Sequence, residues 1–249
     1  MKDWPYPRIF AHRGGGSLAP ENTLAAIRMG QSLGYRAHEF DVKLSKDGVA
    51  MLLHDDTLER TTTGAGRAAD FQWSELSRLD AGGWHSEAFR GEGLASFEAA
   101  AALLRSKDTM ANVEVKPTPG FEAETGRAVA LDAARHWSGA STAPLLSSFS
   151  FEALMAAKDA APRLPRGWLA KELTAEDWTR LAALEAVSFH TDHRKLDRAN
   201  IPRLRDKGYR VMVYTVNDAR VAEELFAAGV DGIFTDNLRE FAARFPDAI

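Results

Sequence analysis

Short β-type runs alternate with amphipathic helical runs along almost the whole chain. Eight strand-then-helix units within 249 residues predict a closed (β/α)8 TIM barrel, an α/β fold whose active site lies at the carboxyl ends of the strands. A doubly wound open sheet is the main alternative, but the first turn, residues 12–16, lacks the glycine spacing of a dinucleotide fingerprint. The eight principal strands are expected to begin near Ile9, Glu39, Val113, Leu146, Trp168, Ser188, Val213 and Ile233.

A hairpin and an insertion interrupt this alternation after the second strand. The turn sequence Lys46-Asp47-Gly48 predicts an antiparallel hairpin between strands at 37–44 and 49–54. Residues 56–93 contain several glycines, show little periodicity and are too many for an ordinary loop, so we expect a small insertion there. No repeat or linker divides the chain, and residues 1–249 are expected to form one domain. Helices are expected at 20–34, 96–104, 120–137 and 150–161.

Composition excludes several classes of protein. The 31 basic and 35 acidic residues leave a net charge of -4, so no global positive field would attract nucleic acid. The absence of cysteine excludes disulfides, thiolate metal sites and a cysteine nucleophile. Residues 1–7 contain no apolar signal-peptide segment, no later run has the ~20 apolar residues of a bilayer-spanning helix, and the insertion lacks a basic amphipathic face. We therefore expect a cytoplasmic protein without stable membrane association; formation of a homodimer is left open.

Charged side chains stand at the carboxyl ends of four predicted strands. Glu39 and Asp41 lie two residues apart, so both face the same way in a strand, and the same holds for Glu114 and Lys116. Three carboxylates at the mouth of one barrel would repel one another unless they were protonated or neutralised by a cation. Hard oxygen ligands favour one divalent cation, Mg2+ or Ca2+, over zinc. The whole set suits a metal-bound phosphoryl group with a proton donor and acceptor: His12, Arg13, Glu39, Asp41, His54, Glu114 and Lys116.

Each of these features also has a purely structural interpretation. A lone Glu-x-Asp on a strand is more often solvated or salt-bridged than a metal site. Arg13 could form a structural ion pair with a barrel carboxylate, and Lys116 could balance Glu39 or Asp41. The glycine run at 14–16 could be only a flexible turn, but it also allows the backbone to approach a ligand closely.

Further residues are expected to line the same cavity. Ser147, His190, Tyr214 and Asp236 fall at or near the carboxyl ends of later strands, where a barrel places its active site. In the insertion, Trp84 and Phe89 are expected to fold over the site as an apolar wall.

The motifs of this chain, taken in order, resemble the glycerophosphodiester phosphodiesterase family. The resemblance rests on Ala11-His12-Arg13-Gly14, Pro20-Glu21-Asn22-Thr23, Glu39-Phe40-Asp41-Val42, Leu53-His54-Asp55, Arg60-Thr61-Thr62, Asn112-Val113-Glu114-Val115-Lys116-Pro117, Leu146-Ser147-Ser148-Phe149, Val213-Tyr214-Thr215-Val216-Asn217 and the segment 229–236. Single pieces are weak, but the ordered set is specific and extends over most of the chain. Segments 4–8, 43–48 and 144–149 are most similar to the cytosolic bacterial branch that serves glycerol phosphate uptake.

This resemblance implies metal-dependent hydrolysis of glycerophosphodiesters, such as glycerophosphocholine or glycerophosphoethanolamine, to sn-glycerol 3-phosphate and an alcohol. By position, Glu39, Asp41 and Glu114 match the metal ligands of the family, and His12 and His54 match its acid/base pair. Arg13 and Lys116 match its phosphate contacts, and Tyr214 stands where many members have tryptophan near the substrate. The segment Ala95-Ser96-Phe97-Glu98 also departs from the proline-containing pattern usual in the family.

The two histidines cannot be assigned by spacing alone. We take His12 as the base and His54 as the donor to the leaving alcohol, since imidazole titrates near neutral pH and suits both tasks. Rival functions are another metal-assisted barrel phosphodiesterase of the phospholipase type, a barrel enzyme that does not act on phosphate, and a binding module without catalysis. The five intact residues His12, Glu39, Asp41, His54 and Glu114 argue against a binding module.

Overall fold

The computed structural model describes residues 4–249 and confirms the (β/α)8 barrel. Eight parallel strands form a ring that closes because β1 pairs with both β2 and β9. Residues 1–3, the start of the run used to exclude a signal peptide, lie outside the described residues. In ring order the strands are β1 (Ile9–Ala11), β2 (Ala37–Leu44), β4 (Met110–Val115), β5 (Leu145–Ser148), β6 (Arg166–Leu169), β7 (Ser188–Asp192), β8 (Arg210–Tyr214) and β9 (Gly232–Thr235).

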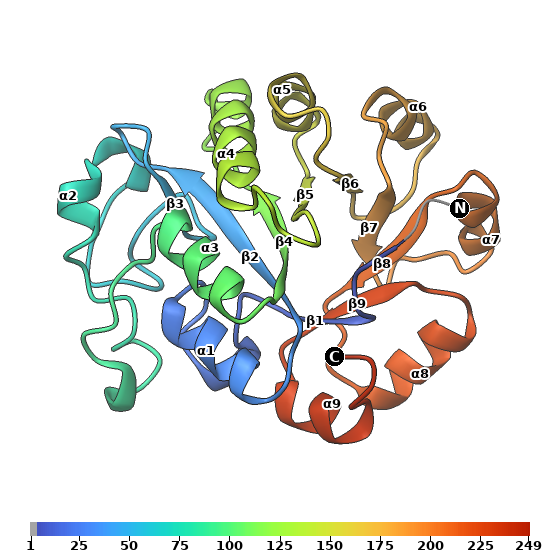
Figure 1. Cartoon of the computed structure of the whole chain (residues 1–249), viewed down its shortest axis with the longest axis horizontal. Coiled ribbons are helices and arrows are strands. Elements are labelled where there is room, and N and C mark those ends of the chain that lie inside the picture. Colours follow the sequence, from blue (N-terminus) through green and yellow to red (C-terminus); the bar gives the residue numbers. More distant parts are fainter. Residues whose placement is uncertain (1–3) are drawn as a thin grey trace.

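Helices surround this ring of strands (Figure 1). Three of them begin at a hydroxyl side chain that accepts a hydrogen bond from the backbone of the first turn: Thr23, Ser96 and Ser150. The first helix begins at Leu24, four residues later than the sequence predicts, because Asn22 has a left-handed φ of 59° that a helix excludes. The surrounding helices are α1 (Leu24–Ser32), α3 (Phe97–Ser106), α4 (Glu122–His136), α5 (Phe151–Ala160), α6 (Ala175–Ala183), α7 (Asn200–Asp206), α8 (Ala219–Ala227) and α9 (Leu238–Arg244).

Alternation along the strands divides the side chains between the outer core and the barrel interior. In β2, Phe40 and Val42 belong to the core beneath the helices, so Glu39 and Asp41 face the interior. The lower layer of the interior is apolar and includes Phe10, Leu145, Met212 and Phe234. The polar side chains therefore stand above a packed floor, at the carboxyl ends of the strands.

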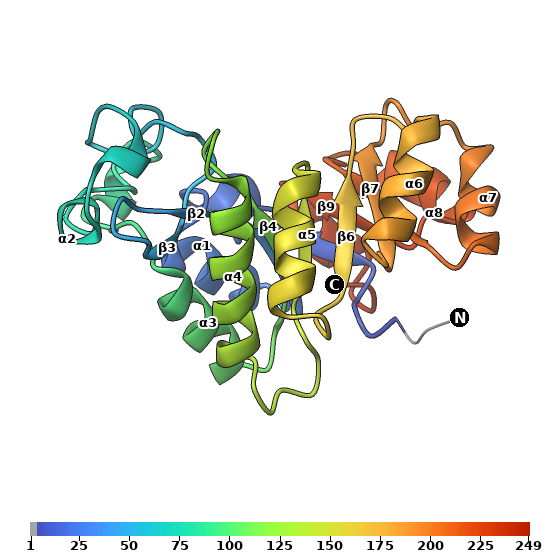
Figure 2. The same cartoon turned by 90° about the horizontal axis from the view of Figure 1, so that it is seen from above.

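The predicted hairpin and insertion lie beside the barrel. Strand β3 (Ala50–Leu52) pairs antiparallel with β2, as the turn sequence predicts. The chain then forms the 3-10 helix η2 (Ala68–Asp70), the helix α2 (Trp73–Leu76) and the 3-10 helix η3 (Glu87–Phe89). Figure 2 shows this region projecting from one side of the barrel. It has its own apolar cluster, which includes Met51, Leu58 and Leu76. Among residues 4–249, no helix combines the length and apolarity needed to cross a bilayer.

Close contact between α4 and α5 depends on Gly126. A Cβ at this position would lie 2.0 Å from the carbonyl oxygen of Ala153, so even a methyl group forces the two helices apart. We expect Gly126→Ala to lower the free energy of unfolding by about 1 to 3 kcal/mol, although alanine has the higher helix propensity. Leu131→Ala, at an exposed position on the same helix, is the control and should change stability by no more than about 0.5 kcal/mol. Urea denaturation of both variants measures the effect, and a Gly126→Ala protein at least as stable as the parent would contradict it.

Candidate active site

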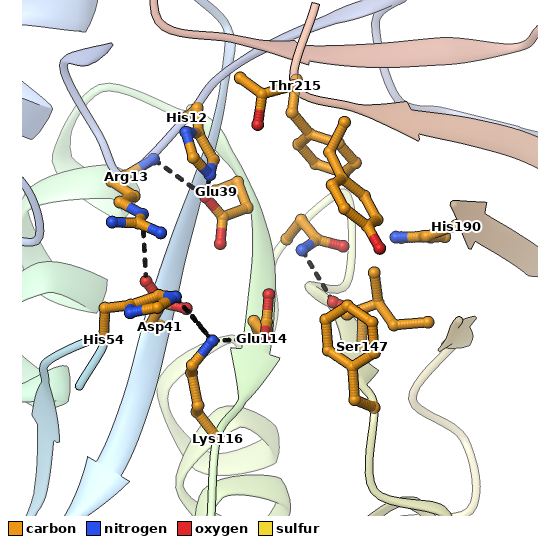
Figure 3. Close-up of a pocket in the computed structure, with 15 residues that line it drawn as sticks. His12, Arg13, Glu39, Asp41, His54, Glu114, Lys116, Ser147, His190 and Thr215 are labelled. Atoms are coloured by element: carbon orange, nitrogen blue, oxygen red, sulfur yellow. Dashed lines mark hydrogen bonds and ion pairs between the residues drawn. The ribbon is translucent and has the colours of Figure 1, made fainter. Parts of the chain in front are cut away.

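A cavity of about 230 Å³ opens at the carboxyl ends of the strands. Figure 3 shows its charged side chains together on one side, and Ser147 and His190 on the other. The charged side consists of His12, Arg13, Glu39, Asp41, His54, Glu114 and Lys116, which is the full set that the sequence predicts for the site. The second side consists of Asn112, Ser147, Phe149, Leu169, His190, Tyr214, Thr215 and Phe234.

Three carboxylates from two neighbouring strands meet in the charged half. One oxygen from each of Glu39, Asp41 and Glu114 lies within 4.8 Å of the other two. Burial and the charge of Asp41 raise the pKa of Glu39 to about 8 and that of Glu114 to about 7. Glu39 and Asp41 expose only 5% and 2% of their side chains. Three hard oxygen donors with such mutual repulsion, two of them buried, fit a divalent cation.

Asp41 is held in its ionised form by its partners. Asn22 donates its side-chain amide to Oδ2 of Asp41 at 2.8 Å, and Oδ1 of Asn22 accepts from the backbone N–H of Asp41 at 3.0 Å. Burial opposes ionisation of Asp41, but Lys116 and Arg13 outweigh it and hold the pKa of Asp41 below its ordinary value. Asn22 thus has a strained, left-handed backbone at the point where its side chain orients Asp41, a candidate metal ligand.

Arg13 reaches three carboxylates from a strained backbone. Its φ of 48° is rare for a residue with a side chain. In this conformation its backbone N–H donates to Glu39 Oε2 at 2.9 Å, while its guanidinium bonds to Glu21 at 2.7 Å and lies 3.7 Å from Asp41. The buried Nε has no hydrogen-bonding partner among residues 4–249. The guanidinium is therefore ordered by protein carboxylates and retains a donor for a ligand.

His12 stands between two acidic groups. Its Nδ1 lies 2.7 Å from Oδ1 of Asp236, and its Nε2 lies 3.7 Å from Oε2 of Glu39. Burial lowers the pKa of His12, but the hydrogen bond to Asp236 and the charges of Glu39 and Asp236 outweigh burial and leave the pKa above its ordinary value. Asn217 in turn donates to Asp236 at 3.1 Å and accepts from its backbone N–H. The ring of His12 is thus fixed, and its protonated form is stabilised.

The surroundings of His54 favour its neutral form instead. Its Nδ1 lies 2.6 Å from Oδ1 of Asp55, and its Nε2 lies 2.8 Å from the Lys116 ammonium. An ammonium group only donates hydrogen bonds, so Nε2 accepts and carries no proton. Burial also lowers the pKa of His54. The imidazole of His54 is therefore neutral, with its lone pair directed at Lys116.

Lys116 links this histidine to the carboxylates. Its ammonium lies 3.2 Å from Glu114 and 3.6 Å from Asp41, in addition to its contact with His54. The ion pair with Asp41 that the sequence offers as a structural alternative is therefore present, and it does not exclude a contact with substrate.

A chain of ion pairs outside the cavity links Asp55, the partner of His54, to Arg13. Arg60 binds Asp55 through Nε at 2.6 Å and Glu21 through Nη1 at 2.7 Å, and Glu21 also binds Arg13. The insertion, which carries Arg60, thereby positions both the partner of His54 and the partner of Arg13. Removing one member of such a network affects the others, since they share hydrogen bonds.

A second, shallower cavity of about 720 Å³ adjoins the first, and His12 and Arg13 line both. Trp84 and Asp236 line this second cavity and are not part of the lining of the first. The expectation that Phe89 forms a wall is not met by the lining of either cavity, because its ring packs edge-on against His85. Trp84 instead keeps an exposed ring, with its indole N–H bonded to the carbonyl of Ala81 at 2.8 Å.

The glycine run after His12 contains a position that only glycine can fill. A Cβ at Gly16 would lie 2.3 Å from the carbonyl oxygen of Asp236, so this glycine allows the loop to pass close to the end of β9. The close approach observed is thus to protein backbone, next to the partner of His12.

Several residues of the site were missed because their partners lie on other segments, at no regular helix or strand spacing. Asn22, Glu21 and Arg60 lie within quoted motifs, but no spacing relates them to Asp41 or Arg13. Asn112 could have been found, since it precedes Glu114 by two residues on the same strand and therefore faces the same way.

Comparison with known proteins identifies the family of this chain. Residues 12–240 match the model of the glycerophosphoryl diester phosphodiesterase family. A glycerophosphodiester phosphodiesterase of Caldanaerobacter subterraneus is 33% identical over 92% of this chain and 93% of its own length. The structure of an Oleispira antarctica phosphodiesterase in complex with the product sn-glycerol-3-phosphate is 31% identical and superposes with a TM-score of 0.89 over 97% of this chain and 98% of that one.

A glycerophosphodiester phosphodiesterase from Agrobacterium tumefaciens is 30% identical, with a TM-score of 0.77 over 95% of this chain and 99% of that one. Both the family match and the relative from Caldanaerobacter extend across the barrel and the insertion. This chain therefore belongs to the glycerophosphoryl diester phosphodiesterase family of phosphoric diester hydrolases.

Proposed function

We propose that the protein hydrolyses glycerophosphodiesters, such as glycerophosphocholine or glycerophosphoethanolamine, to sn-glycerol 3-phosphate and an alcohol, with a divalent cation at its carboxylate cluster. The observation that carries the proposal is the meeting of three carboxylates, two of them buried, with two cations and two histidines in one cavity. The product in the related Oleispira structure supports the substrate class.

Glu39, Asp41 and Glu114 would hold the cation, either Mg2+ or Ca2+. Once bound, it neutralises the carboxylates and stabilises negative charge that develops on the phosphoryl oxygens. Arg13 and Lys116 supply the protein's own positive charge at the same place. Their present partners are carboxylates and His54, and the phosphate of the substrate would take over part of these contacts.

The hydrogen bonds of the two histidines support roles opposite to those taken from the sequence. His54 Nε2 holds a lone pair, so we assign His54 as the acceptor of a proton from the attacking hydroxyl, once Lys116 turns to the phosphate. His12 Nδ1 lies 2.7 Å from Oδ1 of Asp236, whose charge stabilises the protonated ring, and we assign His12 as the donor to the leaving alcohol. The attacking hydroxyl belongs either to water or to the glycerol carbon next to the phosphate ester.

A product assay tests the proposal. The purified protein, treated with a chelator and then supplied with Mg2+ or Ca2+, should release glycerol 3-phosphate from a panel of glycerophosphodiesters. Failure to release it with either ion would refute the proposed function, and full release without any divalent ion would refute the role of the cation.

Trp84 is expected to influence the choice of leaving alcohol. The residue is 44% exposed and lines the cavity next to His12, where the departing alcohol would lie if His12 protonates it. Trp84→Ala should raise KM for bulky or cationic alcohols roughly 2- to 10-fold, as expected for loss of about 0.5 to 1.4 kcal/mol of ring contact. The melting temperature of the Trp84→Ala variant should hardly change. Phe121→Ala, a similarly exposed ring (46%) outside both cavities, is the matched control. An equal loss for every alcohol, together with a lower melting temperature, would assign Trp84 to packing alone.

A further inference from the structure

A separate cavity of about 570 Å³, here called the lower cavity, lies at the amino ends of the strands, opposite the active site. Its lining includes Arg166 and Arg210, the first residues of β6 and β8. No residue lines both this cavity and the main one. Tyr6 lines the lower cavity and Phe234 the main one, and both belong to the apolar cluster in the barrel floor. A molecule in the lower cavity is therefore not part of a substrate bound at the active site.

The lower cavity has an excess of positive charge. The charged residues that line it are Arg163, Arg166, Glu185, Lys207 and Arg210. The one carboxylate among them, Glu185, already binds Lys158 at 2.8 Å. Arg163 and Lys207 form no ion pair among residues 4–249. Cations without a neighbouring carboxylate attract an anionic ligand to such a cavity.

Arg166 is a buried cation without a counter-charge. The residue is only 4% exposed, and its hydrogen bonds go to backbone carbonyls alone. Nε donates to Leu184 at 2.8 Å, and Nη1 donates to Leu164 at 2.5 Å and to Pro162 at 3.1 Å. Its Nη2 makes no hydrogen bond, and the guanidinium makes no ion pair, within the part of the chain that the structure describes. Buried charges in proteins are normally paired, so this guanidinium indicates an anion in the cavity that it lines.

Trp4 supplies an unpaired donor to the same cavity. Its Nε1 is buried and has no hydrogen-bonding partner within residues 4–249. The indole N–H only donates, so a ligand that satisfies it has to provide an acceptor. The ring packs edge-on against Tyr6, with centroids 4.8 Å apart, and the Tyr6 hydroxyl donates to the carbonyl of Ala143 at 2.7 Å. The indole is therefore held in place before a ligand binds.

The other walls of the lower cavity are largely apolar. They include Pro5, Tyr6, Pro165, Val187 and Tyr209. The volume falls in the range of roughly 300 to 1,000 Å³ that is usual for small-molecule sites, and far exceeds what a single inorganic ion needs. The ligand should therefore carry an apolar body in addition to its anionic group.

We propose that the lower cavity is a second ligand site, which binds the phosphate monoester of an apolar group the size of one or two rings. Arg166, Lys207 and the indole N–H of Trp4 hold the phosphate, and the apolar walls hold the body. A phosphate monoester carries a charge of about -1.5 to -2 at neutral pH, which matches several unpaired cations better than one carboxylate does. The proposal is independent of the proposed function, since the site lies at the other end of the barrel.

Calorimetry with 1-naphthyl phosphate tests the proposal. A chelator is present, so that no divalent cation holds the phosphate at the active site. The parent protein should bind the probe with a Kd below about 1 mM. Inorganic phosphate lacks the body and 1-naphthol lacks the charge, so each should bind at least about 10-fold more weakly.

Two variants locate the bound probe. Trp4→Phe keeps an aromatic ring but removes the N–H, and Lys207→Ala removes an exposed cation; each should weaken binding about 3- to 10-fold. Both spare the three carbonyl contacts of Arg166, whose own replacement could unfold the chain. Trp73→Phe and Lys46→Ala, at positions that line none of the three cavities described, are the matched controls and should leave the Kd unchanged.

Three results would overturn the proposal. One is a Kd above about 1 mM for 1-naphthyl phosphate in the parent protein. Another is equally tight binding of inorganic phosphate or of 1-naphthol, because the site would then not require both parts of the ligand. The third is a Kd that responds to Lys116→Ala but not to Trp4→Phe or Lys207→Ala, since the probe would then lie in the active site. None of these measurements depends on turnover, so failure of the proposed function leaves the test intact.

Discussion

Replacing Glu114 by glutamine is expected to abolish most of the divalent-ion binding and most of the activity together. The substitution keeps the shape of the side chain and its contact with Lys116, but removes one of three anionic oxygens that lie within 4.8 Å of one another. Loss of residues that merely support metal ligands typically costs 10- to 100-fold in affinity or activity, so loss of a ligand should cost at least about 100-fold. Titration calorimetry with Mg2+ and with Ca2+, next to the glycerol 3-phosphate release assay, measures both quantities.

A control separates this effect from a change in net charge. Glu98 is exposed on the outer helix α3, so Glu98→Gln changes the charge of the protein equally and should leave metal affinity and activity within about 2-fold of the parent. Circular dichroism should show both variants folded, because the mutual repulsion at the cluster falls in Glu114→Gln. Full activity of Glu114→Gln in buffer freed of divalent ions would contradict the assignment of Glu114 as a metal ligand.

The barrel could be predicted because its signal is local and repeats. Strand β2 was predicted with its observed bounds, Ala37 to Leu44, because a tight-turn sequence follows it directly. The start of α1 was predicted too early, because the conformation of Asn22 is set by its two hydrogen bonds to Asp41, nineteen residues later. Local propensity does not contain such tertiary contacts.

The same distinction between local signals and tertiary contacts applies to the site. The period of two along a strand places Glu39 with Asp41 and Glu114 with Lys116, and barrel topology brings both pairs to one edge. The partners that set the state of each histidine could not be predicted in this way. Asp236 is 224 positions from His12, and Lys116 is 62 positions from His54. The assignment of acid and base therefore changed only when these contacts were known.

The two histidines should respond differently to the leaving group of the substrate. If His12 protonates the leaving alcohol, His12→Ala should lose roughly 10²- to 10⁴-fold in kcat/KM with a choline diester. It should lose far less with a p-nitrophenyl diester, because nitrophenolate leaves as a stabilised anion and needs no proton. His54→Ala should be impaired with both substrates, since the attacking hydroxyl still has to lose its proton.

Asp236 supplies a further test of the same assignment. Asp236→Asn removes the charge that stabilises protonated His12 but keeps a group next to its Nδ1. Asp236→Asn should therefore lose activity with the choline diester and retain most of it with the aryl diester, as His12→Ala does but to a smaller extent.

Measurement of kcat/KM for all three variants on both diesters decides which histidine is the acid and which is the base. Rescue of His54→Ala by the aryl ester, with His12→Ala still impaired, would restore the assignment made from the sequence. Rescue of neither would show that neither ring donates the proton to the leaving alcohol, because only proton donation becomes dispensable when the leaving group is stable.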